Sequence, residues 1–182
     1  MKSRHVHIIL SYQDGTGQTN RLTGARRAKI GIFDCVEVFY NGQGIILARQ
    51  GKNQEAVAHF AEALRMKPDR PEIYTNMAHS LSGWGEIEEA ISFHRKTMDV
   101  QPDHFGAHYN LGKALVRQGK IQEAIVHYKK SLQIKPNFAE AHFDLGLAYV
   151  MIGNQISALQ EYHILQTIRP ELAQHLSQKI PK

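Results

Sequence analysis

Eleven histidines are the side chains in this sequence best suited to metal chemistry. His104 and His108 stand four residues apart, a spacing at which two imidazoles on one helix face can bind a metal ion. However, no third ligand follows at a convincing spacing. Tyr74 and His142 lie 34 residues to either side of His108, which is typical of a packing position. We therefore expect structural or solvated histidines, with no metal and no cofactor.

Other reactive groups in the sequence lack the neighbours that their chemistry needs. The glycines of residues 15–17 are not followed by the lysine of a phosphate-binding loop. No motif that would lower its pKa surrounds Cys35, so we expect a small buried hydrophobe. Glu86, Glu88 and Glu89 suit the start of a helix, where the helix dipole favours acidic groups. No constellation supports acid–base or nucleophilic catalysis, and we expect that the protein is not an enzyme.

The positive charge of the chain is concentrated at its start. Residues 1–36 carry six basic and two acidic side chains, whereas the remainder is nearly neutral despite the overall charge of +5. A solvated basic segment explains this better than a nucleic-acid-binding surface. The sequence has no apolar run long enough to span a bilayer, and residues 1–10 do not resemble a signal peptide. We expect a cytoplasmic protein that binds no nucleic acid and does not span a membrane.

A spacing of 34 residues organises most of the chain. Proline cannot continue a helix and usually marks its end, so evenly spaced prolines indicate one unit copied several times. Three columns of identical residues share this period: Pro68, Pro102, Pro136 and Pro170; Gly51, Gly85, Gly119 and Gly153; Ala56, Ala90, Ala124 and Ala158. The predicted units are residues 37–70, 71–104, 105–138 and 139–172, with residues 1–36 before them and 173–182 after them.

Each unit has the pattern of two amphipathic helices. In the third unit apolar residues recur at helical spacing from His108 to Leu115 and again from Ile121 to Leu132, with Gly119 between. Such a unit is a helical hairpin, which has to stack on its neighbours to cover its apolar surface. Residues 1–36 do not align with the repeat. Residues 6–10 could form a strand, and residues 19–33 a helix.

Small and bulky residues recur within the units at fixed places. Glycine in the middle of a helix costs about 1 kcal/mol against alanine, so it indicates close packing. We expect the first-helix glycines to approach the alanine column of the second helix, and the bulky column to fill the space between hairpins. The first-helix column is Gly44, Ala78, Gly112 and Gly146, and the bulky column is Phe60, His94, Tyr128 and Tyr162.

These residues resemble the tetratricopeptide repeat, most clearly in residues 107–115 with Gly119, Tyr128 and Pro136. The resemblance covers residues 37–172. It implies an all-α fold, an α-solenoid of four helix-turn-helix hairpins forming part of a right-handed superhelical turn. Leu172, Leu176 and Ile180 recur four residues apart, so we expect residues 173–182 to form a short helix that caps the last hairpin.

In this family the first helices line a concave groove that holds a partner's peptide or helix. The resemblance therefore implies a protein–protein interaction scaffold that binds its partner there. An apolar cluster on the fourth repeat and two cations on the third predict a partner with apolar and acidic character. The candidate groove residues are Asn76, His79, Tyr109, Asn110, Lys113, Arg117, Phe143, Leu147, Val150 and Met151.

Two alternatives remain open at this point. The chain could be a self-associating structural array, with homo-oligomers formed through the groove or end to end, or the non-catalytic repeat portion of a larger transferase or regulatory protein. Some family members clamp the C-terminal carboxylate of a chaperone with lysine, asparagine and arginine. Here Asn41, Ile45, Tyr109 and Lys113 occupy those positions, so the clamp is incomplete and we do not expect chaperone binding through it.

Overall fold

The computed structural model describes residues 11–13, 19–21 and 32–181. Strand β1 (Ser11–Gln13) pairs antiparallel with β2 (Thr19–Arg21), so the helix expected over residues 19–33 is wrong at its start. The strand expected at 6–10 and the glycines of 15–17 lie outside the described residues. The helices of the described part are α1 (Ile32–Arg49), α2 (Asn53–Met66), α3 (Pro71–Trp84), α4 (Ile87–Val100), α5 (Phe105–Arg117), α6 (Ile121–Ile134), α7 (Ala139–Met151), α8 (Gln155–Ile168) and α9 (Pro170–Ser177).

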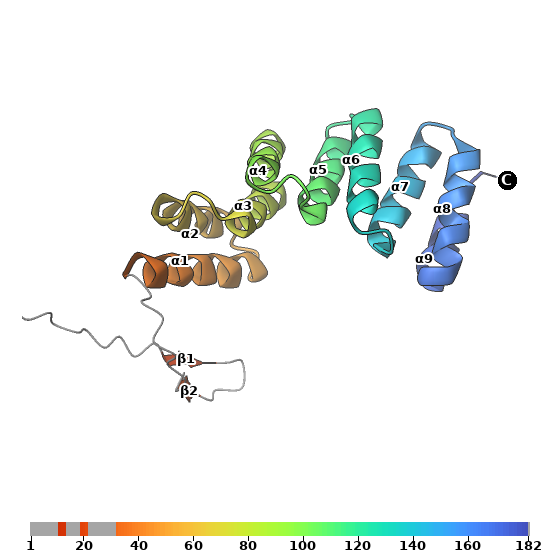
Figure 1. The fold of residues 1–182 in the computed structure, drawn as a ribbon. Helices are drawn as coiled ribbons and strands as arrows, with labels where there is room; N and C mark the ends of the chain where they lie inside the picture. The colour runs from red at the N-terminus through yellow and green to blue at the C-terminus, as the bar shows by residue number, and fades with distance from the viewer. Residues whose placement is uncertain (1–10, 14–18, 22–31, 182) are drawn as a thin grey trace, which may run out of the picture.

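The helices form successive hairpins arranged along one row, an all-α solenoid. Figure 1 shows the pairs α1–α2, α3–α4, α5–α6 and α7–α8 following one another, with α9 at the C-terminal end. Each of α1, α3, α5 and α7 also contacts the next odd-numbered helix, so these helices form one layer along the row. The turn glycine of every hairpin has a positive φ, between 74° and 107°, which only glycine adopts without strain.

The recurring prolines stand where the second helix of each hairpin ends. For example, α6 ends at Ile134, and Pro136 follows the C-cap residue Lys135. Pro170 has a second role because it is also the first residue of α9, a position where its missing N–H costs nothing. The capping helix therefore starts before the predicted residue 173. Similarly, α1 starts at Ile32, before the predicted first unit at residue 37.

The close approach expected at the first-helix glycines involves a different partner from the predicted alanine column. A Cβ atom built on Gly44 would lie 2.6 Å from the ring of Phe60, and one on Gly112 would lie 2.6 Å from the ring of Tyr128. In the first and third hairpins, the bulky residue of the second helix thus packs its ring against the glycine of the same hairpin. The alanines at 56, 90, 124 and 158 are fully buried as well.

The last hairpin is covered by α9. Leu176 is fully buried, and one of its methyl groups occupies the space that a side chain at Gly146 would need, 2.5 Å from the built Cβ. Leu172 and Ile180 pack against the same cluster. This arrangement confirms the predicted capping helix. Among the described residues, no helix is both long and apolar enough to cross a membrane.

Candidate functional site

The odd-numbered helices are joined by polar contacts between residues 35 positions apart, one residue more than the sequence period. Asn76 of α3 has its Nδ2 3.5 Å from Oδ1 of Asn41 on α1. Arg117 of α5 donates from Nη1 to the carbonyl oxygen of Ser82 on α3, at 2.6 Å. Side chains from neighbouring first helices therefore meet along the layer in which the sequence placed the groove.

Tyr109 makes the third contact of this kind, and it holds two hairpins together. Its hydroxyl donates to Oδ2 of Asp144 on α7 at 2.8 Å, and its ring packs against Tyr128 and Phe138. Burial and the nearby carboxylate of Asp144 raise the pKa of Tyr109. Lys113 lies 5.4 Å from the centre of the Tyr109 ring. Tyr109, a candidate groove residue from the sequence, is therefore already engaged within the fold.

The apolar residues of α7 do not form the contiguous exposed patch that the sequence suggested. Phe143 and Leu147 are half-buried and pack against the cluster that contains Leu176 of the capping helix. Val150 packs against the central cluster of the solenoid. Only Met151 is largely exposed, at 62 %. The capping helix thus takes up most of this surface, which helical spacing alone could not indicate.

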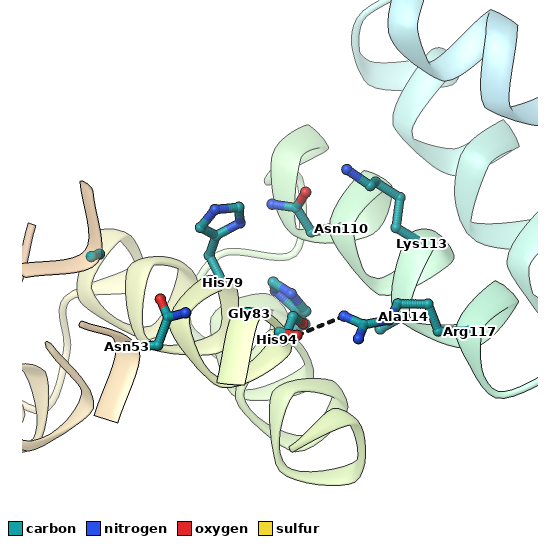
Figure 2. A pocket seen from close by; sticks show the side chains of 10 residues that line it. Asn53, His79, Gly83, His94, Asn110, Lys113, Ala114 and Arg117 are labelled. Atoms are coloured by element: carbon teal, nitrogen blue, oxygen red, sulfur yellow. Dashed lines mark hydrogen bonds between the residues drawn. The ribbon is translucent and has the colours of Figure 1, made fainter. Parts of the chain in front are cut away.

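Four of the candidate groove residues instead line one cavity of about 350 Å³ between α3 and α5. His79 comes from α3, and Asn110, Lys113 and Arg117 come from α5. Figure 2 shows these side chains around the opening, with the hydrogen bond of Arg117 reaching across to α3. The other lining residues are Ala48, Asn53, Ser82, Gly83, His94 and Ala114.

His94 of α4 forms part of the wall of this cavity, although it was not among the candidate groove residues. Its side chain is only 1 % exposed, and its Nδ1 atom has no hydrogen-bond partner in the described structure. Burial lowers the pKa of His94 to about 4, with smaller contributions from His79 and His104, so the ring is neutral at pH 7. The sequence did carry a signal, because His94 is the one histidine in the bulky column.

The histidines first considered as metal ligands have other partners. His104 is the N-cap of α5, where its Nδ1 accepts a hydrogen bond from the amide of Ala107 at 3.0 Å. In His108, Nδ1 lies 3.2 Å from Nδ1 of His127, and Nε2 lies 3.1 Å from the carbonyl oxygen of Pro102. Among the described residues, no group of three histidine, cysteine or acidic side chains could hold a metal ion. Cys35 is half-buried, less than expected.

A layered row of helical hairpins defines the chain as an α-solenoid repeat protein. Family models confirm the kind of repeat: two models described as tetratricopeptide repeat match residues 39–74 and 71–104, and one described as TPR repeat matches residues 112–153. The chain belongs to the tetratricopeptide repeat family. Proteins of this kind are typically non-catalytic scaffolds.

Solved structures share this fold at low sequence identity. MamA residues 41 to the end from Desulfovibrio magneticus RS-1 is 23 % identical, with a TM-score of 0.72 over 82 % of this chain and 85 % of that one. YrrB, a TPR protein with an unusual peptide-binding site, is 21 % identical, with a TM-score of 0.68 over 78 % and 74 %. The first TPR of Spaghetti (RPAP3), bound to an HSP90 peptide, is 22 % identical, with a TM-score of 0.64 over 68 % and 99 %. No curated protein matches the sequence.

Proposed function

We propose that this chain is an interaction scaffold that holds a partner peptide or helix along the layer formed by α1, α3, α5 and α7. The observation that carries the proposal is the cavity between α3 and α5. It gathers His79, Asn110, Lys113 and Arg117 from two successive first helices around one open site. An amide such as Asn110 both donates and accepts hydrogen bonds, which suits it to the backbone of an extended peptide.

Two solved relatives support the proposal. YrrB has an unusual peptide-binding site, and the Spaghetti domain is bound to an HSP90 peptide. Both share the fold of this chain. Because their identity to it is low, the partner has to be inferred from this chain's own side chains. The exposed cations Lys113 and Arg117 favour acidic partners, and the exposed Met151 offers one apolar contact beyond them.

Site-specific photo-crosslinking in cells tests the groove directly. A photoreactive phenylalanine analogue replaces the exposed His79 in one variant and Val126, which lies on α6 and is 64 % exposed, in the other. We expect covalent adducts with a partner protein from position 79 and not from position 126. Adducts of equal yield from both positions, or none from position 79, would contradict binding in the groove.

Self-association is the second candidate, and the exposed apolar residues of α8 favour it. Ile156 is 75 % exposed and Leu159 is 44 % exposed, three residues further along the same helix. Exposed apolar groups at helical spacing commonly mark an interface. Light scattering over a range of concentrations separates the candidates, because a mass that stays at that of one chain excludes the homo-oligomer.

A further inference from the structure

Two histidine rings meet inside the third hairpin. Nδ1 of His108 on α5 lies 3.2 Å from Nδ1 of His127 on α6, and the two rings stack with their centres 5.5 Å apart. The other ring nitrogen of His108, Nε2, lies 3.1 Å from the carbonyl oxygen of Pro102, in the connection between α4 and α5. The buried side chain of His108 therefore joins α5 both to α6 and to the end of the preceding hairpin.

The hydrogen bonds of His108 determine where the protons of this pair lie. A carbonyl oxygen only accepts, so Nε2 of His108 carries the proton, and Nδ1 is an acceptor in the neutral ring. His127 then donates from its own Nδ1. A proton added to Nδ1 of His108 would place two N–H groups opposite each other, 3.2 Å apart. The contact therefore requires a neutral His108.

The surroundings of the pair also disfavour a charge on either ring. Burial is the largest cause that lowers the pKa of both His108 and His127 below the ordinary value of histidine. The two carboxylates nearby are matched by two cations, so no net negative charge compensates an added proton. The charged and titratable groups that act on the two rings are Arg95 from α4, Asp103 and His104 from the connection, and Glu123 and Lys130 from α6.

The fourth hairpin has the same contact with a different partner. At the position 34 residues after His108, His142 faces the carboxylate of Glu161 in place of a second histidine. It also faces the carbonyl oxygen of a proline, Pro136. Because both of its ring nitrogens face acceptors, the doubly protonated ring is the satisfied form there. Falling pH should therefore weaken the contact in the third hairpin and preserve it in the fourth.

We propose that the contact between His108 and His127 is a pH-sensitive switch that opens the solenoid at the junction of the second and third hairpins. As pH falls through about 6.5, the open form binds protons that the closed form excludes, so the open form gains population. The first turn of α5 then loses its contacts with α6 and with Pro102. The fourth hairpin stays closed. This proposal concerns the free chain and does not depend on the proposed function.

Amide hydrogen exchange, measured residue by residue by NMR on the full chain, tests the switch. The amides of Ala107 and His108 report on the first turn of α5, and those of Ala141 and His142 occupy the equivalent places in α7. Protection factors correct for the intrinsic pH dependence of exchange. Between about pH 7.5 and about pH 5, we expect them to fall at least about tenfold in α5, the factor for one pKa unit, and not to fall in α7.

Reciprocal exchanges between the two hairpins separate the pair from general acid destabilisation. His127→Glu gives the third hairpin the pair of the fourth, and we expect it to make the fall in α5 at least about threefold smaller. Glu161→His gives the fourth hairpin the pair of the third, and it should produce a fall in α7 that the native chain lacks.

Two further variants are controls. His104→Asn keeps a side-chain acceptor at the N-cap of α5 but removes a titrating ring, so the fall in α5 should persist. His163→Gln removes an exposed histidine of α8, and its amides should exchange like those of the native chain.

Several results would overturn the proposal. Equal falls in α5 and α7 of the native chain, or no fall in α5, would mean that the third hairpin has no special sensitivity to acid. An undiminished fall in His127→Glu would mean that other groups carry the response. Loss of the fall in His104→Asn would assign it to the helix cap. No new fall in Glu161→His would show that two facing histidines do not make an acid-sensitive contact.

Discussion

Nδ1 of His142 lies 2.6 Å from Oε2 of Glu161, and Nε2 of the same ring lies 2.8 Å from the carbonyl oxygen of Pro136. Both ring nitrogens thus face acceptors, an arrangement that only the doubly protonated imidazolium satisfies. The equivalent ring one repeat earlier, His108, faces His127 instead of a carboxylate. The same fold position therefore favours the charged form of histidine in the fourth hairpin and the neutral form in the third.

This arrangement predicts how His142 changes stability with pH. Burial disfavours its charge, but the hydrogen bonds to Glu161 and Pro136, with the charge of Glu161, together raise the pKa of His142. Its stabilisation is therefore fully present below the unfolded-state pKa of about 6.5 and is lost as pH rises through the folded-state pKa. Glu161→Gln should cost about 1.5–3 kcal/mol on the acidic side and less at alkaline pH. Denaturant unfolding of the native chain and the variant, at pH values below and above the pKa of His142, measures this cost. An equal cost at every pH would refute an ion pair between His142 and Glu161.

His94 predicts the opposite dependence. Because burial, with smaller contributions from His79 and His104, lowers its pKa to about 4, only the unfolded chain binds this proton as pH falls from about 6.5. Acid should therefore destabilise the native chain through His94 by an amount on the order of 3 kcal/mol by pH 4. The variant Ala78→Gly with His94→Tyr lacks the titrating ring and should lose less stability on acidification. Thermal unfolding of both proteins over this pH range measures the difference. An equal loss of stability in the two proteins would contradict the assignment of this acid sensitivity to His94.

The glycine at position 112 tests the ring packing of the third hairpin. Gly112→Ala would place a methyl group 2.6 Å from the ring of Tyr128, so the ring has to shift in a filled core. We expect a loss of about 1–3 kcal/mol in the free energy of unfolding. Gly42→Ala is the matched control, because a Cβ there meets nothing within 4 Å and alanine favours a helix by about 1 kcal/mol. A Gly112→Ala variant as stable as the native chain would show that the ring does not need the glycine.

The hydrogen bond between Tyr109 and Asp144 couples the third hairpin to the fourth. Burial raises the pKa of Asp144, although the bond from Tyr109 and the charge of Lys113 act in the other direction. A double-mutant cycle of Tyr109→Phe and Asp144→Asn should give a coupling of about 0.5–3 kcal/mol in unfolding free energy. Additive single effects would mean that the two side chains do not stabilise each other.

The sequence was sufficient to predict the fold because its strongest signals are backbone signals. Proline after each second helix and glycine at each turn act locally, so their 34-residue spacing alone predicts the hairpins. The groove was harder to predict, because it depends on what each side chain meets. The family resemblance placed Phe143 in the groove, but its packing depends on α9, a separate element.

The cavity could not be predicted from the sequence for the same reason. In the sequence, His94 is the one histidine in the bulky column. The cavity that it lines, however, also depends on Ala78 in the other helix of the hairpin and on cations from α5. No local pattern brings these residues together. The residues predicted along α5 do meet in the cavity, because Lys113 and Arg117 are one helical turn apart on the face toward α3. The predicted repeat boundaries remain a prediction.

The most direct test of the central claim compares partner capture by two charge-reversal variants. Lys113→Glu with Arg117→Glu reverses both cations of the cavity, whereas Lys129→Glu with Lys130→Glu makes the same change in net charge at exposed positions of α6. Quantitative affinity capture from the native cell, followed by mass spectrometry, compares both with the native chain. The account predicts that the first variant loses its partner at least about tenfold while the second retains it. Retention by both variants, or an equal loss in both, would contradict binding at this site.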